Sequence, residues 1–393
     1  MARFFIRLLL LAGVCLGVLF FLKARSGQQP LPRPLNLTPH TVRVAVEGRP
    51  SELPLYALHA LLSKAESAGQ VTLEIEQFAD PGERWRQLAA GEIDLVLASL
   101  DEFALAVPRF NPGQVLFATS LSVGSDAVVA MADTPEAQVL RLAFVSGSPG
   151  EYLAARLVAQ ETDRVILPIP APNLTVASEW YEQGAVQALA VCEPALRDYL
   201  KRGDQILIQT SSQAPITHVW VASRQALRNE RNPRVSRADL EEVAGAWFVL
   251  ISELRQQPGL ALGAIARGND SQVSEVEQAF VGLEFLSLQE SQALNAQVLV
   301  PQLDLLSSFW SLSGALNAHK PDSFEAELEQ SMLGTIKAPA IPAPPPEPSA
   351  THSPTLLLSP SASPLPLLAP SPSPETPDVP DPFSPVPMPA PSP

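Results

Sequence analysis

The sequence predicts an α/β protein of two lobes joined by two crossovers, with a transmembrane helix at its N-terminus and a disordered proline-rich tail. Three observations predict this organisation. Over residues 41–337, short runs that are apolar, or in which apolar and polar residues alternate, are interspersed with amphipathic stretches. This pattern indicates strands and helices packed in layers. The alternation starts again at 140–145, which indicates a second lobe. Of the 41 prolines in the 393-residue chain, 21 lie in residues 338–393, so the proline excess belongs to a tail.

The first series of elements extends to residue 132. Strands are predicted where apolar residues alternate or run together, and helices where apolar residues recur every three or four positions. The predicted strands are 41–47, 71–78, 93–99, 114–120 and 126–132, and the predicted helices are 55–65, 82–92 and 101–107.

The second series has predicted strands at 140–145, 164–169, 187–193 and 205–210, and helices at 150–160, 173–183 and 195–202. From residue 222 onward the pattern is almost entirely helical, with long amphipathic segments at 237–256, 271–281 and 299–315. Strands that alternate with helices form parallel sheets with helices on both faces, and we expect two such sheets. We expect crossovers near 120–130 and 211–222, so the first lobe is 41–125 with 218–335 and the second is 126–217.

Residues 1–25 have the pattern of a membrane-targeting segment. An apolar run from Leu8 to Leu22 follows Arg3 and Arg7, as in a signal anchor or a signal peptide. No small-x-small cleavage site follows the run. This favours a signal anchor that holds the chain on the extracytoplasmic face of a membrane, with a cleaved signal peptide as the alternative. Residues 26–40 are predicted to be a linker.

The tail, 338–393, has no glycine, lysine or arginine and is rich in serine and proline. This composition favours extended polyproline II structure and disorder. The sequence leaves three roles open for it: a spacer, a ligand for a proline-recognising domain, or a solvated extension.

Charge and residue content exclude several classes of protein. The formal net charge of −15 argues against binding to nucleic acid. The two cysteines, Cys15 and Cys192, cannot form a disulfide framework or a cysteine-based zinc site. The five histidines show no metal-ligand spacing such as HExxH, and no P-loop or nucleophile–base pattern is present. We therefore expect no metal, no cofactor and no enzymatic activity.

Six strings of residues resemble, in the correct order, the ABC-transporter solute-binding proteins of the nitrate/sulfonate/taurine/thiamine-precursor group. They are VAVEGRPSELPLYALHALL (44–62), LAAGEIDLVLASLDE (88–102), SVGSDAVVA (122–130), FVSGSPGEYLAARLVA (144–159), WYEQGAVQALAVCEPALRDYLKRG (180–203) and AWFVLISELRQQPGLALGAIA (246–266). The resemblance implies a periplasmic-binding-protein-like fold of two lobes.

The resemblance also implies a function. It suggests a monomeric, extracytoplasmic solute-binding component of an ABC importer, with an ABC permease and ATPase as partners. The solute would be a small organic or anionic molecule, such as a sulfonate, nitrate, bicarbonate or a pyrimidine. Arg49, Gln187, Cys192 and His218 depart from the pattern of the group and leave the solute open. The alternative is a membrane-tethered sensor or envelope interaction protein that keeps the fold without transport.

Loops that follow strands hold the candidate ligand-binding residues, because open α/β sheets bind ligands at the carboxyl ends of their strands. The candidates are Glu47, Arg49, Ser99, Ser122, Gly147, Ser148, Glu193, Ser212 and His218.

Several of these candidates have two interpretations. The turn at 146–150 is either an anion site made of backbone N–H groups or an ordinary serine N-cap. Glu193 is expected either to meet the ligand or to hold the lobes together. Arg49 could pair with a sulfonate or carboxylate, or remain solvated at the rim. Ser122 and Asp126 favour a hinge role, whereas Asp101 and Glu102 fit the first turn of a helix.

Overall fold

The computed structural model describes residues 41–64, 71–78, 80–132, 134, 139–228, 235–312 and 332–336. These residues belong to one compact unit, Met1–Ala340. A second unit, Ile341–Pro393, lies outside the described residues, as do the expected anchor 1–25, the linker 26–40 and the tail 338–393. Within the described ranges, no helix has the length and apolar character needed to cross a membrane.

The first lobe contains a six-stranded sheet of order β11-β4-β10-β3-β1-β2. Its strands are β1 (Thr41–Val46), β2 (Thr72–Gln77), β3 (Leu95–Ser99), β4 (Gly113–Ser122), β10 (Ile216–Ser223) and β11 (Leu283–Phe285). The strand β1 pairs in parallel with β2 and β3, whereas β10 pairs antiparallel with both β3 and β4.

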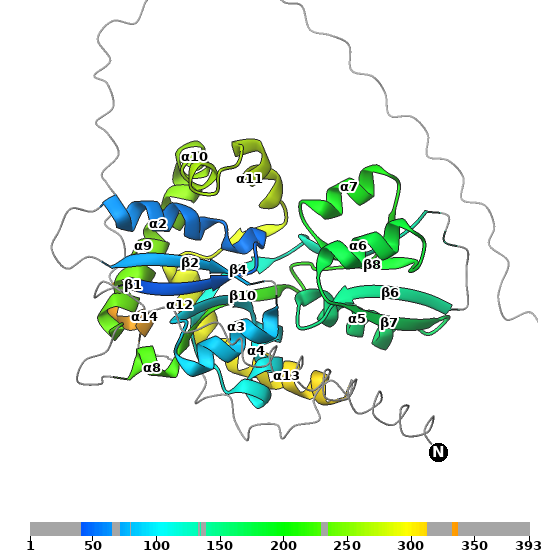
Figure 1. The fold of residues 1–393 in the computed structure, drawn as a ribbon, viewed down its shortest axis with the longest axis horizontal. Helices are drawn as coiled ribbons and strands as arrows, with labels where there is room; N and C mark the ends of the chain where they lie inside the picture. Colours follow the sequence, from blue (N-terminus) through cyan, green and yellow to red (C-terminus); the bar gives the residue numbers. More distant parts are fainter. Residues whose placement is uncertain are drawn as a thin grey trace, which may run out of the picture. The chain divides into compact units, whose positions relative to one another are not determined.

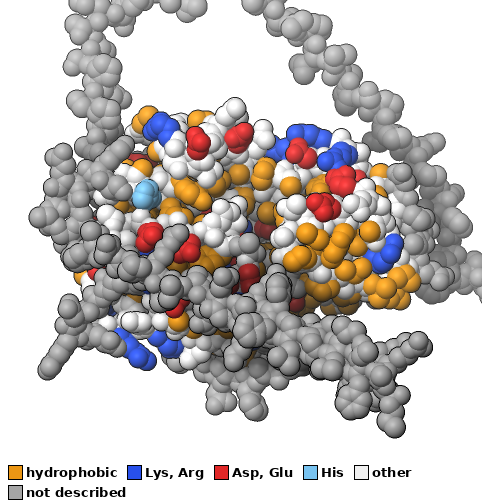
Figure 2. Space-filling view, viewed as in Figure 1, with side chains coloured by type: hydrophobic (Ala, Val, Ile, Leu, Met, Phe, Trp, Pro, Cys, Tyr) orange, Lys and Arg blue, Asp and Glu red, His pale blue; other side chains and the backbone are white. Residues whose placement is uncertain are grey.

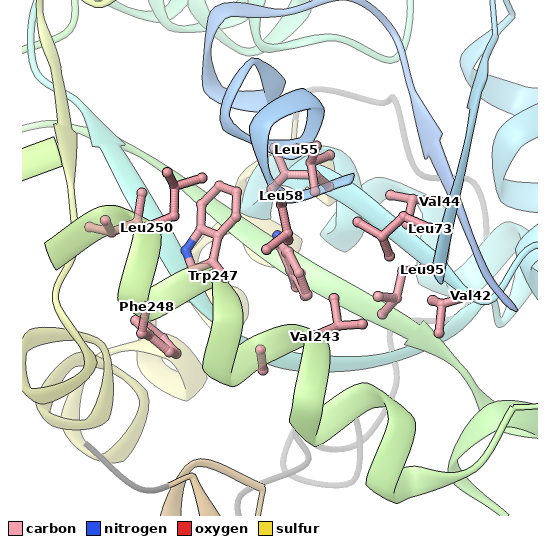
Figure 3. Packing of buried hydrophobic residues seen from close by; sticks show 14 of the residues in the cluster. Val42, Val44, Leu55, Leu58, Leu73, Leu95, Val243, Trp247, Phe248 and Leu250 are labelled. Atoms are coloured by element: carbon pink, nitrogen blue, oxygen red, sulfur yellow. The ribbon is translucent and has the colours of Figure 1, made fainter. Parts of the chain in front are cut away.

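Helices cover both faces of this sheet. They are η1 (Pro50–Glu52), α2 (Pro54–Lys64), α3 (Pro81–Ala90), α4 (Leu100–Phe110), α8 (Arg224–Leu227), α9 (Arg237–Gln256), α10 (Pro258–Gly268), α11 (Val273–Ala279), α12 (Leu288–Gln297), α13 (Leu299–Leu312) and α14 (Met332–Thr335). Successive strand residues point to opposite faces of a sheet. Val44 accordingly packs in the cluster with α2 and α9, and Ala45 packs in the cluster with α3, α4 and α13. Figure 3 shows the first cluster, in which Trp247 of α9 lies near Leu58 of α2.

The second lobe contains a five-stranded sheet of order β7-β6-β8-β5-β9 (Figure 1). Its strands are β5 (Asp126–Ala130), β6 (Val139–Val145), β7 (Val165–Ala171), β8 (Ala188–Cys192) and β9 (Gln205–Gln209), and its helices are α5 (Pro149–Gln160), α6 (Leu174–Glu182) and α7 (Ala195–Lys201). The chain passes from β4 to β5 and returns from β9 to β10, so two crossovers join the lobes.

The expectation of purely parallel sheets is wrong, because each sheet is mixed. In the second lobe, β5 runs antiparallel to β8 and β9, and in the first lobe β10 runs antiparallel to its neighbours. Both strands directly follow a crossover. A strand that arrives from the other lobe enters its sheet at the edge where the parallel strands end, and it must therefore run in the opposite direction.

Two details at the C-terminal side also differ from expectation. The second crossover ends before Ile216, because residues 216–223 form a buried strand and not a connection. Among the described residues beyond β10, the three residues of β11 form a strand within the otherwise mainly helical pattern, and they pair with β4 next to the first crossover.

Candidate functional site

A cavity of about 910 Å³ lies between the two lobes. Its walls include the loop that follows β1, the start of α5 and the residues that follow β8, so it opens where strands of both sheets end. In the space-filling view, acidic side chains lie in the crease between the two halves of the described chain (Figure 2). Of the nine predicted ligand-binding residues, those that line the cavity are Glu47, Arg49, Ser148, Glu193 and His218.

A buried group of two arginines and three glutamates supports the first-lobe wall. We call it the Arg–Glu cluster; its members are Arg49, Arg84, Glu47, Glu52 and Glu102. Arg49 donates to both carboxylate oxygens of Glu102, at 2.6 Å from Nη1 and 2.5 Å from Nη2, and Nη2 also donates to Glu47. The Arg84 side chain is fully buried, and its Nη2 lies 2.9 Å from Glu47 Oε1 and 3.6 Å from Glu102 Oε1. Both guanidinium groups are therefore already matched by carboxylates.

Glu52 of η1 occupies the backbone N–H groups of the loop after β1. Its carboxylate accepts from the backbone nitrogens of Glu47 (3.0 Å), Gly48 (2.7 Å) and Arg49 (2.7 Å). Three successive N–H groups that converge in this way form a nest that binds an anion. The positive φ of Gly48, +86°, makes the turn possible. The nest at this strand end is filled by a carboxylate of the protein itself.

Burial and charge shift the pKa values of this region in opposite directions. Burial raises the pKa of Glu52 to about 7, and Arg49 only partly offsets it. Burial also raises the pKa of Asp101 to about 7, with a further contribution from the neighbouring Glu102. For Glu102 burial again opposes ionisation, but Arg49 and Arg84 outweigh it and lower its pKa to about 2. Glu102 is therefore a permanent anion at neutral pH.

In the second lobe, the turn before α5 hydrogen-bonds within itself. The Gly147 N–H donates to the Glu151 carboxylate at 2.6 Å, and the Gly150 N–H donates to Ser148 Oγ at 3.1 Å. The Ser148 hydroxyl in turn donates to the Val145 carbonyl at 2.7 Å. Ser148 is thus the N-cap of α5, and the N–H groups of Gly147 and Gly150 are already satisfied.

Hydroxyl groups and one carboxylate fix the first crossover. Ser122 Oγ donates to Asp126 Oδ2 at 2.5 Å and lies 2.9 Å from Thr210 Oγ1 on the second crossover. Ser125 Oγ also donates to Asp126 Oδ2, at 3.0 Å. Asp126 itself lines the cavity, so this residue belongs both to the hinge and to the site.

Glu193, His218 and Cys192 complete the polar wall. Glu193 follows β8, is 5% exposed and accepts the Arg197 N–H at 3.3 Å. Burial lowers the pKa of His218 to about 4, so the ring is neutral at pH 7, with Nδ1 3.1 Å from Ser120 Oγ. Burial, followed by the charge of Asp126, raises the pKa of Cys192 to about 12. The thiol is therefore protonated and is not an activated nucleophile.

The remaining predicted residues lie away from the cavity wall. Ser99 is the buried N-cap of α4, where its N–H and Oγ donate to Glu102 at 2.8 and 2.9 Å. Ser122 lies in the hinge, the Gly147 N–H donates to Glu151, and Ser212 is exposed in the second crossover.

Sequence reasoning missed several residues of this region, among them Arg84, Glu52, Glu275 and Ser51. Arg84 lies between Glu83 and Trp85 on the amphipathic helix α3, and no sequence signal distinguishes it from a solvent-exposed arginine. Ser51 lies in η1, directly after the loop that follows β1, and this closeness to a strand end was the available signal. Within the described part of the chain, no group of three His, Cys, Asp or Glu side chains is arranged to hold a metal ion.

No family model matches the chain, and no curated protein matches its sequence. Solved structures do match its backbone. The periplasmic aliphatic sulphonate-binding protein SsuA from Escherichia coli is 14% identical with a TM-score of 0.55, over 76% of this chain and 100% of that chain. The fold is that of the periplasmic solute-binding proteins. This confirms the bilobal fold that the sequence resemblance predicted.

Two further matches have the same solute-binding fold. The alkanesulfonate-binding protein SsuA from Xanthomonas axonopodis pv. citri, bound to MOPS, is 15% identical with a TM-score of 0.53, over 71% of this chain and 94% of that one. The ligand-binding component of an ABC-type import system from Staphylococcus aureus is 10% identical with a TM-score of 0.55, over 76% of this chain and 99% of that one.

Proposed function

We propose that the chain is the extracytoplasmic solute-binding component of an ABC importer and captures a small organic solute between its lobes. The observation that carries this proposal is the cavity of about 910 Å³, which is lined by polar side chains of both lobes at strand ends. Cavities of this size at such positions are the usual binding sites of open α/β folds. An ABC permease and ATPase are the proposed partners, and the N-terminal segment is the proposed membrane tether.

The crossovers suggest how capture works. The strands β4 and β10 are neighbours in the first sheet, and each is continuous with a crossover. Asp126, Ser122 and Thr210 join the two crossovers by hydrogen bonds. The lobes can therefore rotate about one narrow pair of segments, while each sheet remains intact. A solute that contacts both walls favours the closed arrangement over the open one.

Thermal unfolding of the full chain with single solutes tests the proposal. The panel contains sulfonates, nitrate, bicarbonate, pyrimidines and amines. A solute at one hundred times its Kd stabilises the folded state by about 2.7 kcal/mol, which raises Tm by several degrees. If no solute changes Tm although circular dichroism shows a folded chain, the proposal is wrong.

A pair of variants ties the effect to the cavity. Thr175→Trp places a large side chain at an exposed position of the cavity wall and is expected to remove the stabilisation. Thr162→Trp makes the same change at an exposed position that does not line the cavity, and it is expected to keep the stabilisation. Equal effects of the two variants would place binding elsewhere.

A further inference from the structure

We propose that the solute is an organic cation with N–H donors, such as a protonated amine or guanidine, and not an anion. This inference rests on the proposed function, because it names the class of solute that the same cavity takes. It differs from the sulfonates after which the two SsuA proteins, both structural neighbours, are named.

The charges that line the cavity are the first argument. The acidic residues in its wall are Glu47, Asp126, Glu193 and Glu275. Arg49 is the one lysine or arginine among the described lining residues, and both of its Nη groups are engaged by Glu47 and Glu102. His218 is neutral at pH 7 because burial lowers its pKa to about 4. Glu47 is paired with Arg49 and Arg84, but among the described residues no ion pair involves Asp126, Glu193 or Glu275. An anion entering this cavity meets these three carboxylates, whereas a cation is attracted by them.

The backbone donors are the second argument. An anion bound at strand ends needs free N–H groups. In the first lobe, Glu52 takes the N–H groups that follow β1, and in the second lobe Glu151 takes the N–H of Gly147. The N–H groups at both strand ends are therefore already bonded to a carboxylate of the protein. They are not free to replace the hydration shell of an incoming anion.

Unused hydrogen-bonding capacity in the wall is the third argument. Ser51 lines the cavity and is 2% exposed, and its hydroxyl has no hydrogen-bond partner among the described residues. A buried polar group without a partner is costly, so this hydroxyl indicates a ligand. At Asp126, the hydrogen bonds recorded between described side chains use Oδ2, which leaves Oδ1 to accept from a ligand N–H.

The apolar lining of the cavity indicates the chemical character of the solute beyond its charged group. Leu53, Phe78, Leu153 and Leu174 line the cavity beside the acids, so the cation has an apolar body. Phe78 is the one Phe, Tyr or Trp among the described lining residues, and a single aromatic ring cannot form the cage that holds a quaternary ammonium group. An ion with N–H donors uses the carboxylates and the serine hydroxyl better than a quaternary ion does.

This arrangement gives the solute a direct effect on the lobes. Glu275 of α11 belongs to the first lobe, and Glu193 belongs to the second. Without a cation the two walls carry like charge, which favours separation. A cation between them replaces repulsion with attraction from both sides, and it thereby favours the closed state.

The test measures Tm and Kd of the full chain with matched probes. Agmatine, putrescine and butylamine are the cations with N–H donors, choline is the cation without them, and butane-1-sulfonate and nitrate are the anions. Butylamine and butane-1-sulfonate share one alkyl chain and differ in the sign of their charge. We expect at least one of the three amines to raise Tm, and we expect the anions and choline to have no effect at equal concentration.

Glu193→Gln connects binding to the cavity charge. Its side-chain oxygen can still accept the Arg197 N–H, so the fold is retained while the charge is lost. We expect amine affinity to fall roughly tenfold to a hundredfold, as for the loss of one charge-assisted hydrogen bond. The matched control Glu179→Gln changes an exposed glutamate of α6 outside the cavity and is expected to leave Kd unchanged.

The outcomes separate the two proposals. Stabilisation by butane-1-sulfonate or nitrate, without an amine effect, overturns the cation inference and leaves the proposed function intact. Binding of choline as tight as that of the amines, or an unchanged Kd in Glu193→Gln, also overturns the inference. If the wider solute panel and these probes all fail to change Tm of a folded chain, both proposals are wrong.

Discussion

Replacing Glu102 by glutamine is expected to destabilise the first lobe by about 3 kcal/mol, because a buried charge then loses its partner. Glu102 accepts two hydrogen bonds from Arg49, at 2.6 and 2.5 Å, and two from Ser99, at 2.8 and 2.9 Å. A glutamine side chain keeps one acceptor oxygen, which can still cap α4 through Ser99. The paired contact with Arg49 is lost, and hydrogen bonds to charged groups contribute about 1.5–3 kcal/mol each.

Urea unfolding followed by tryptophan fluorescence measures this loss. Four of the five tryptophans, Trp85, Trp220, Trp247 and Trp310, are buried in the first lobe, so the signal reports mainly on the lobe that holds Glu102, with a contribution from Trp180 of the second lobe. The free energy of unfolding is obtained from the midpoint and slope of the transition. Far-UV circular dichroism at zero urea checks that the variant is folded.

A surface ion pair on α3 provides the control. Glu83 lies 2.7 Å from Arg86, but their side chains are 43% and 53% exposed. Glu83→Gln is therefore expected to change the free energy of unfolding by less than about 1 kcal/mol. If Glu102→Gln is no more destabilising than Glu83→Gln, the Arg–Glu cluster is not a stabilising element of the lobe and the reasoning fails.

Three other changes have distinct expected outcomes. The pKa of Asp101 is raised to about 7 by burial, so its contribution to stability is complete below about pH 4 and is lost as pH rises through 7. The free energy of unfolding, measured with urea, should therefore fall between pH 5 and pH 8 by about 1–2 kcal/mol less in Asp101→Asn than in the unmodified protein. An equal fall in the two proteins would contradict this. Ser51→Ala removes a buried hydroxyl without a partner, so thermal unfolding should show an unchanged or higher Tm together with weaker solute binding; a clearly lower Tm would show that the hydroxyl is bonded in the free protein. Gly282→Ala should lower stability by about 2 kcal/mol or more, because φ is +74° and a Cβ would lie 2.5 Å from backbone of Gly124 at the first crossover. At Gly245, within a helix, an added Cβ has no atom within 4 Å, so Gly245→Ala should instead stabilise the protein by about 0.5–1 kcal/mol. Equal changes of Tm in Gly282→Ala and Gly245→Ala would refute the argument.

The periodicity of the sequence predicted most strands and helices because their apolar patterns are local. The strands at 41–47 and 93–99 and the helix at 150–160 needed no knowledge of the rest of the chain. Strand direction could not be predicted in this way. Residues 216–223 form a strand that runs against its neighbours, and only its arrival from the other lobe determines that direction.

The sequence indicated which strand-end residues line the candidate site, but not how the charges there are balanced. Glu47 and Glu193 line the cavity because they directly follow strands, which the sequence already indicated. Whether the charge of Arg49 is balanced within the protein depends on Glu102 and on the buried Arg84, which lie 53 and 35 positions away in the sequence. Contacts of this kind leave no periodic signal, so an apparently free guanidinium proved to be matched within the protein.

The carboxylate of Glu52 acts as a built-in competitor of any external anion. It holds the three N–H groups of its loop and is covalently attached, so it is present at every solute concentration. In the first lobe, the exclusion of anions therefore depends on this one side chain in addition to the acidic residues of the wall. In Glu52→Gly, the three backbone N–H groups near Arg84 would lose their carboxylate partner. Titration of that variant with sulfate would show whether one substitution is enough to change the preference from cations to anions.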